Sequence, residues 1–177
     1  SADSLKNSKL YVNDAIEFAS YYIAAKADKL YGKALAEDAV GRSAVAQQYL
    51  NQTIDMLLNV DKLLAPHPLY RLEEWVNFAR NSGTTPAEKD AYEINAKRLI
   101  TTWGGFQEDY AARFWSGLIK DYYIPRLKIY FSKQRGSLDN WEEEWINTPW
   151  INTTVPFDNP LDMAVELVQE VKEIRTE

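Results

Sequence analysis

The chain has 177 residues, of which 46% are hydrophobic and 26% are charged, and its net charge at pH 7 is -6. This composition is typical of a folded globular protein, and the length suits one domain rather than two large ones. The acidic balance argues against a function that depends on neutralising nucleic-acid phosphates. No apolar run reaches the roughly 18 residues that a membrane-spanning helix needs. We therefore expect neither a nucleic-acid partner nor a membrane partner.

Apolar residues recur at helical spacing through most of the chain. Gly32 or Gly41 is expected to end or punctuate the first helix, and Pro66 ends the second. Thr85 can cap the fourth helix, where Glu88 would complete a capping box. In chain order, the spacing predicts helices over residues 4–31, 42–64, 69–80, 85–102, 107–123, 125–135, 138–147 and 159–174.

Strand-like alternation is nearly absent, and residues 151–155 are the only short candidate for a strand. The expected fold is therefore all-α, a single-domain helical bundle of about seven to eight helices over residues 1–177. Long helices occupy its first half, and acidic helices occupy residues 138–176. Residues 101–157 hold 13 of the 23 aromatic residues, which makes this stretch the most informative about function.

The sequence offers few groups for bond-breaking chemistry. Cysteine is absent, and the single histidine, His67, lies between two prolines, so we expect neither a metal site nor a cofactor. Glu166 and Glu170 have the helical spacing that brings two carboxylates to about 5 Å, as in a retaining glycosidase. They would, however, reach a sugar from the same side, whereas that reaction needs one acid on each side of the bond. Geometry therefore excludes this pair as the two acids of such a reaction.

Aromatic residues are the better candidates for a binding role. Trp103, Phe106, Tyr110 and Phe114 are spaced to form one stripe along the expected fifth helix. Packing in the core explains phenylalanines at such spacing, while Trp and Tyr carry a polar tip that suits the walls of sugar-binding sites. For Trp103, which precedes two glycines, both interpretations stay open.

Four segments between residues 95 and 127 form a series of motifs. They are Asn95-Ala96-Lys97-Arg98, Thr101-Thr102-Trp103-Gly104-Gly105, Asp109-Tyr110-Ala111 and Trp115-Ser116-Gly117-Leu118-Ile119-Lys120-Asp121-Tyr122-Tyr123-Ile124-Pro125-Arg126. These motifs closely resemble the C-terminal helical domain of the α-N-acetylglucosaminidases, glycoside hydrolase family 89. Gly105 stands where that family has a proline and Leu127 where it has a tryptophan, and these departures bear on the shape of the turn and on one wall of the site.

The resemblance implies an exo-acting enzyme that removes terminal α-linked N-acetylglucosamine with retention, using two glutamates of a preceding (β/α)-barrel domain. Such a barrel takes about 250 residues, so this chain is too short to contain it. The domain is thus expected to be the C-terminal accessory domain of a multidomain glycosidase, inactive alone, with the barrel and a glycan as partners. The start at Ser1 suits a fragment of a longer protein. A periplasmic, secreted or lysosome-like location is expected from the resemblance.

Within this interpretation, the domain packs on the barrel and completes one side of the substrate cleft. A helical carbohydrate-binding domain or a protein-interaction domain, both non-catalytic, stay open as alternatives. The residues expected nearest the cleft are Trp103 and Tyr110. Asn95 and Arg98 would either bind substrate or tie the Trp103 turn to the preceding helix, with the structural role slightly favoured. The residues expected in the internal seam and at the barrel-facing contact are Trp115, Tyr122, Tyr123 and Arg126.

Overall fold

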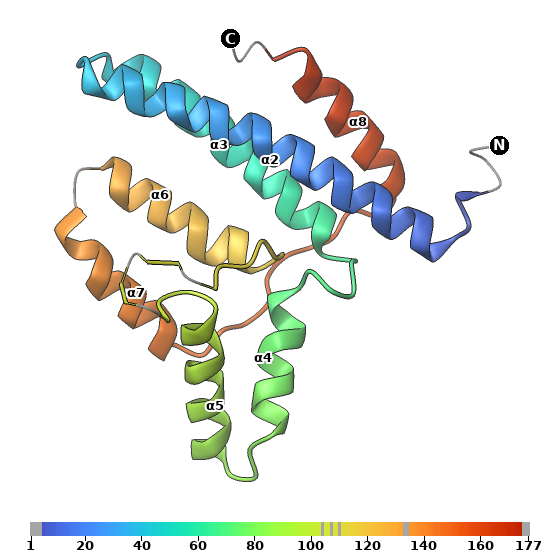
Figure 1. The fold of residues 1–177 in the computed structure, drawn as a ribbon, viewed down its shortest axis with the longest axis vertical. Coiled ribbons are helices and arrows are strands. Elements are labelled where there is room, and N and C mark those ends of the chain that lie inside the picture. The colour runs from blue at the N-terminus through green and yellow to red at the C-terminus, as the bar shows by residue number, and fades with distance from the viewer. Residues whose placement is uncertain (1–4, 104, 107, 110, 133–134, 175–177) are drawn as a thin grey trace. The chain divides into compact units, whose positions relative to one another are not determined.

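The computed structural model describes residues 5–174 except 104, 107, 110, 133 and 134. Over this part of the chain the fold contains seven α-helices, a π-helix and a 3-10 turn, and no strand (Figure 1). The all-α class and the expected number of helices are therefore confirmed. The elements are α2 Lys9–Ala39, α3 Ser43–Leu64, α4 Leu72–Asn81, α5 Pro86–Leu99, the π-helix Ile119–Tyr123, α6 Ile124–Phe131, the 3-10 turn Arg135–Ser137, α7 Leu138–Asn147 and α8 Pro160–Lys172.

The chain divides into two compact units. One is formed by residues 1–67 with residues 154–177, and the other by residues 68–153. We call them the hairpin unit and the motif unit, because the second contains the motifs between residues 95 and 127. A single domain over the whole chain stays a prediction.

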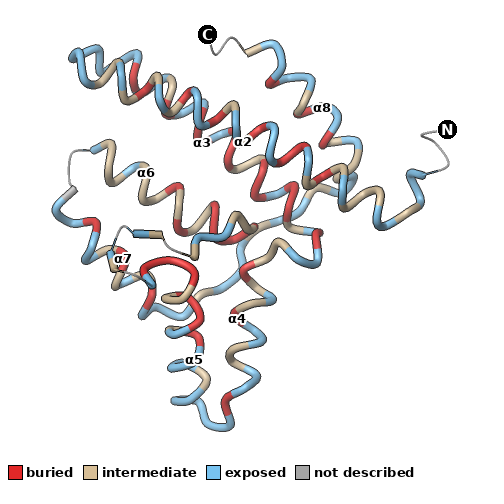
Figure 2. Tube along the Cα trace, in the orientation of Figure 1, coloured by how far each residue is buried: buried red, intermediate tan, exposed pale blue. Residues whose placement is uncertain are grey.

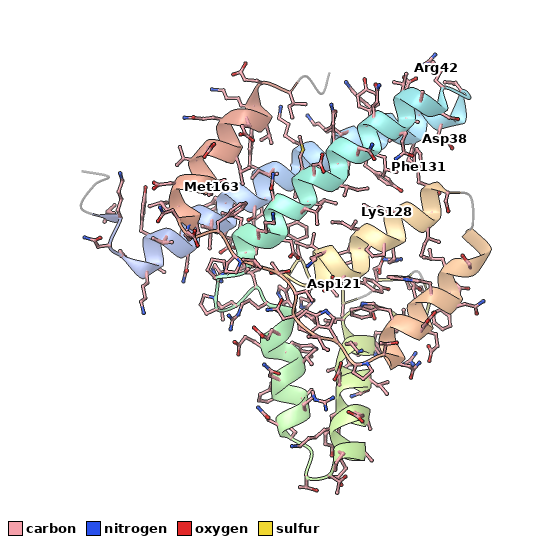
Figure 3. The ribbon with its side chains drawn as sticks, turned by 180° about the vertical axis from the view of Figure 1, so that it is seen from behind. Asp38, Arg42, Asp121, Lys128, Phe131 and Met163 are labelled. Carbon is pink, nitrogen blue, oxygen red and sulfur yellow. The ribbon has the colours of Figure 1, made fainter. Side chains whose placement is uncertain are left out.

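The hairpin unit consists of α2 and α3, which form a hairpin of long helices, and of α8 alongside them (Figure 1). Helix α2 continues through Gly32, where an added Cβ would meet no atom within 4 Å. The chain reverses at Gly41, which has a φ of 79°, a conformation that glycine adopts without strain. In Figure 3 the labels of Asp38 and Arg42 mark this turn. The core side chains include Ile16, Ile23, Leu30, Leu50, Val60, Leu63, Leu64, Leu167 and Val171.

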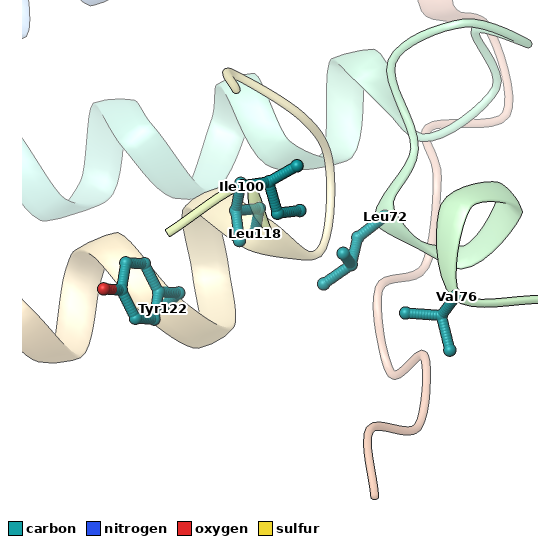
Figure 4. Close-up of a cluster of buried hydrophobic side chains, with 5 residues drawn as sticks. All are labelled: Leu72, Val76, Ile100, Leu118 and Tyr122. Carbon is teal, nitrogen blue, oxygen red and sulfur yellow. The ribbon is translucent and has the colours of Figure 1, made fainter. Parts of the chain in front are cut away.

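The motif unit begins with the α4–α5 hairpin. At the start of α5 the backbone N–H of Glu88 donates to Thr85 Oγ1 at 3.2 Å, and Thr85 N–H donates to Glu88 Oε2 at 3.1 Å. The expected capping box is therefore confirmed. A buried apolar cluster forms the core of this unit, and Figure 4 shows its members, Leu72, Val76, Ile100, Leu118 and Tyr122.

The helix expected over residues 107–123 is wrong for most of its length. The described residues between 101 and 117 form turns and irregular backbone, and the chain stays buried directly after α5 (Figure 2). Backbone pairing with a distant segment holds this irregular path. Ser116 N–H donates to the Tyr70 carbonyl and Leu72 N–H donates to the Ser116 carbonyl, each at 2.9 Å. Gly117 follows with a φ of 85°, which favours glycine and prevents a helix from continuing there.

Helical structure resumes as a π-helix over Ile119–Tyr123, which runs directly into α6. Pro125 has no N–H to donate and its ring would crowd the carbonyl four residues before it, so a wider turn suits this position. After α7, residues 148–157 form the expected loop and contain no strand. Among the described residues, no helix combines the length and the apolar character that crossing a bilayer requires.

Candidate functional site

Trp103 lies at the surface of the motif unit and lines a large pocket there. Thr101 and Thr102 before it are buried, whereas Trp103 itself is 56% exposed. The pocket is open and has a volume of about 590 Å³. Apolar side chains dominate its lining, which consists of Pro68, Leu69, Arg71, Glu74, Trp75, Phe78, Leu99, Ile100, Trp103, Ala111, Arg113 and Trp115.

Three tryptophans give this pocket its character. The rings of Trp75 and Trp115 lie 6.1 Å apart at an interplanar angle of 59°. Trp75 Nε1 donates to the Ala96 carbonyl at 2.8 Å, which fixes one ring and satisfies its polar group. Leu69 and Phe78 extend the apolar surface outward, since they are 74% and 72% exposed. A cluster of exposed large apolar side chains is typical of an interaction or ligand site.

A few charged groups border the apolar pocket. Arg71 forms an ion pair with Glu74, and its second nitrogen lies 4.0 Å from Glu73. Arg113 Nη1 donates to the carbonyls of Ala111 and Ala112 at 2.9 and 3.1 Å, so the loop itself orients this guanidinium. Apolar walls with a small number of polar groups at the border are the usual composition of small-molecule sites.

Asn95 and Arg98 occupy different surroundings. Asn95 is exposed and lines a smaller pocket of about 180 Å³, with Tyr92 and Phe78. Arg98 forms a two-pronged ion pair with Glu143 of α7, with distances of 3.0 Å from Nη1 to Oε2 and 2.7 Å from Nη2 to Oε1. The hydrogen bonds of this pair raise the pKa of Arg98 and lower that of Glu143. Arg98 thus ties α5 to α7, whereas the structural role expected for it was to tie the Trp103 turn to the preceding helix.

Of the four residues expected at the seam and the domain interface, one lines the large pocket and three are buried or partly buried within the unit. Trp115 lines the large pocket. Tyr122 is fully buried, so it belongs to the internal seam and cannot offer a surface to another domain. Tyr123 is partly buried, and burial followed by the charge of Asp109 raises its pKa to about 12. Arg126 is directed toward Asp109 within the same unit.

The expected aromatic stripe is not present as one face of a helix, because the helix itself is absent here. Trp103 and Phe106 are exposed and Phe114 is half-buried, each on irregular backbone. Tyr110, which we expected beside Trp103 at the cleft, lies outside the described residues.

Sequence reasoning missed a buried ionic network within the motif unit. Lys97 is fully buried, and its Nζ donates to the carbonyls of Trp145, at 3.2 Å, and Thr148. Its charge is balanced by Glu93, whose Oε1 lies 3.3 Å away. Burial lowers the pKa of Lys97, and Glu93 opposes that shift. The i,i+4 spacing of Glu93 and Lys97 was the available signal, although the same spacing is common on exposed helices.

Sequence reasoning also missed Trp75 and Phe78 as pocket walls. Helix α4 buries Leu72 and Val76 on one side, while Trp75 and Phe78 line the pocket on another. Their spacing of three residues indicates a shared helix face, but it does not distinguish a second packed face from an open one.

The described residues contain no group of His, Asp and Glu that could hold a metal ion. Glu166 and Glu170 both lie exposed on α8 in the hairpin unit. His67 is buried, and burial lowers its pKa despite the opposing charges of Glu17 and Asp14. The large pocket contains a single carboxylate, Glu74, so it is equipped to contact ring surfaces but not to supply a pair of acids.

Residues 1–170 match the family model of the α-N-acetylglucosaminidase (NAGLU) C-terminal domain. The chain belongs to this family. Its assignment as a C-terminal helical domain of a glycosidase, expected from the motifs between residues 95 and 127, is therefore confirmed.

Known relatives agree with the family assignment. The chain is 35% identical over 78 residues to the human α-N-acetylglucosaminidase, a match that covers 43% of this chain and 10% of that protein. A family 89 glycoside hydrolase from Clostridium perfringens, in complex with 2-acetamido-1,2-dideoxynojirmycin, superposes with a TM-score of 0.82 at 22% identity. That comparison covers 96% of this chain and 22% of the solved chain.

A second solved structure of the Clostridium perfringens enzyme, in complex with GlcNAc-α-1,4-galactose, gives a TM-score of 0.81 at 22% identity over 95% of this chain. At this level of identity the likeness establishes the fold. The chain spans 22% of that solved relative, and 10% of the human protein.

Proposed function

We propose that this chain is the C-terminal domain of a retaining exo-α-N-acetylglucosaminidase, which packs against a (β/α)-barrel elsewhere in the same polypeptide and completes the substrate cleft. The observation that carries this proposal is the large pocket of the motif unit, with Trp103 at its surface. The family assignment supports it, as do the ligands bound in the solved relatives, an iminosugar and an α-linked N-acetylglucosamine disaccharide.

The chemistry of the pocket fits a wall rather than a bond-breaking centre. Ring faces such as that of Trp103 pack against the apolar face of a sugar, and the pocket provides several of them. The two acids that a retaining mechanism requires would come from the barrel. Pockets of this kind occur preferentially where two domains meet.

Replacement of Trp103 by alanine tests the proposal in the intact polypeptide. We expect kcat/KM for an aryl α-N-acetylglucosaminide to fall about ten- to a hundredfold, which corresponds to about 1.4–2.7 kcal/mol of lost transition-state binding. Because Trp103 is more than half exposed, the melting temperature should change little.

Phe18 offers a matched control for this experiment. It is 73% exposed on α2, in the hairpin unit, and does not line the pocket. F18A should therefore leave both kcat/KM and stability near the wild-type values. An equal loss of activity and stability in W103A would assign Trp103 a packing role and contradict the proposal.

A helical carbohydrate-binding function is the second candidate, favoured by the same exposed tryptophan. The two functions differ in what the chain does alone. A binding domain would take up N-acetylglucosamine-terminated glycans as an isolated chain, with a heat of binding measurable by calorimetry. A wall completed by the barrel would not.

A further inference from the structure

An ionic cluster formed by Arg126, Glu142 and Tyr122 binds Asp109 in the loop that carries Trp103. Asp109 has a φ of 50°, and among the described residues it is the one non-glycine with a positive φ. Such a conformation is uncommon for a residue with a Cβ, and it persists where the surroundings enforce it. Strain of this kind concentrates at sites where geometry matters for function.

Arg126 is the group that holds the Asp109 side chain. Its Nη1 donates to both carboxylate oxygens of Asp109, at 2.8 and 2.9 Å. Its Nε lies 2.7 Å from Glu142 Oε1, and its guanidinium lies 5.2 Å from the centre of the Tyr122 ring. Tyr122 in turn donates its hydroxyl to Glu142 Oε1 at 3.0 Å. Glu142 and Tyr122 thus hold the arginine, which in turn binds Asp109 of the loop.

The burial of this cluster makes a purely stabilising role a poor explanation. The side chain of Arg126 is 14% exposed and that of Glu142 is not exposed at all. Removing such charges from water costs several kcal/mol per ion, which their attraction offsets only with good geometry. Apolar side chains of similar volume would stabilise the seam at least as well, whereas they could not hold a carboxylate on a loop in one position.

Two backbone hydrogen bonds link Thr102, Gly105 and Glu108, the described loop residues that neighbour Trp103 and Asp109. Gly105 N–H donates to the Thr102 carbonyl at 3.0 Å, and Glu108 N–H donates to the Gly105 carbonyl at 3.3 Å. The φ of 143° at Gly105 is one that a proline ring cannot adopt, so this turn differs from one with proline at that position. The two hydrogen bonds therefore order described residues next to both the clamped residue and the exposed ring.

We propose that Arg126 is a positioning residue, which clamps Asp109 so that the loop presents Trp103 to the sugar in one orientation. The proposal rests on the function proposed above, since it assigns Trp103 to the cleft wall. Arg126 itself contacts no substrate. Its loss leaves the tryptophan present but free to adopt several positions, and the substrate then has to order it on binding.

The primary test variant is D109G in the intact polypeptide. Glycine accepts the positive φ without strain, so the fold is kept while the clamp is lost. We expect KM for the aryl glycoside to rise about tenfold and kcat to stay within about twofold, because binding rather than bond breaking is affected. The dissociation constant of 2-acetamido-1,2-dideoxynojirmycin, measured by calorimetry, should rise by a similar factor.

R126K is the second variant. A lysine lacks the planar fork with which arginine reaches Asp109 and Glu142 together. The variant should raise KM in the same direction as D109G. R80Q is the stability control. Arg80 pairs with Asp90 at 2.8 Å and with the buried Glu93 at 2.5 Å, away from the loop. Its loss should lower the melting temperature while KM stays unchanged.

The double variant D109G/W103A separates the two proposals. If the clamp acts through Trp103, the double variant binds the iminosugar no more than about twofold more weakly than W103A alone, because the second change has nothing left to position. Independent, multiplying effects would overturn the clamp. Wild-type affinity in D109G would also overturn it while leaving the cleft wall intact, and wild-type affinity in W103A would overturn the cleft wall itself.

Discussion

Trp150 shows how much of the motif unit depends on single side chains. Its backbone N–H donates to Glu93 Oε1 at 2.6 Å, and its ring Nε1 donates to Asp121 Oδ2 at 2.9 Å. The same ring packs on Gly117, where a Cβ would lie 2.7 Å from it. Three distant segments therefore meet at one tryptophan. The sequence alone could not name these partners, because they come from residues 29 to 57 positions away.

The charge of Asp121 is expected to cost stability at neutral pH. Burial raises its pKa, although the Trp150 hydrogen bond and the charge of Lys120 oppose that shift. A carboxyl whose pKa is higher in the folded state favours folding at low pH and loses that contribution as the pH rises. D121N keeps an acceptor for Trp150 and removes the charge. The gain in free energy of unfolding of D121N over wild type should therefore be larger near pH 7 than below pH about 4. At the lower pH the carboxyl of the unfolded wild-type chain is protonated as well.

Denaturant unfolding of the purified chain at the two pH values measures this difference. Figure 3 labels Asp121 near the start of α6. The exposed Asp28 on α2 gives the control, because D28N removes a charge from water rather than from the interior. A stability difference for D121N that is the same at both pH values would contradict the assignment.

Gly117 is expected to be intolerant of any side chain. Its φ of 85° disfavours other residues, and a Cβ would approach the Trp150 ring to 2.7 Å and Leu72 Cβ to 3.2 Å. G117A should lower the free energy of unfolding by about 2–3 kcal/mol, from backbone strain and overpacking together. Thermal or denaturant unfolding gives the value. A loss below about 0.5 kcal/mol would mean that Trp150 moves aside without cost.

At the scale of elements, the helical pattern located most helices correctly and misplaced several of their ends. The helix over residues 42–64, the capping box before α5 and the short acidic helix over residues 138–147 depend on local spacing, which the sequence contains. The expected fifth helix failed because the pairing of Ser116 with the segment before α4 is not local. Periodicity records which residues could share a helix face, but not a competing backbone partner 45 residues away.

Helix α2 provides the opposite case, since it passes through a glycine that could have ended it. Apolar burial on both sides of Gly32, at Leu30 and Ala34, stabilises the helix by more than the glycine costs. G32A should therefore raise the free energy of unfolding by about 0.5–1 kcal/mol, because alanine favours the helix and its Cβ meets nothing. Unfolding curves of G32A beside G117A make a matched pair of opposite sign. Destabilisation by G32A would show that α2 is bent or interrupted at this position.

At the scale of the whole molecule, the sequence identified the family, while the candidate site emerged only from the fold. The motifs between residues 95 and 127 led to the family that the comparison of residues 1–170 confirms. Trp103 was singled out, but Trp75, Phe78 and the clamp of Asp109 by Arg126 were not. The role of Trp75 and Phe78 depends on which helix face stays exposed after folding, and the clamp depends on which charged groups come into contact. The spacing of residues along the chain specifies neither.

The central claim is that this chain supplies a wall of the cleft and none of the acids that break the glycosidic bond. Its most direct test is the hydrolysis of an aryl α-N-acetylglucosaminide by the purified 177-residue chain, with the intact polypeptide measured alongside. Circular dichroism of the same sample should first show the helical fold. The account predicts turnover by the intact polypeptide and none above the buffer blank by the chain alone. Turnover that scales with the concentration of the isolated chain and survives repurification would contradict it.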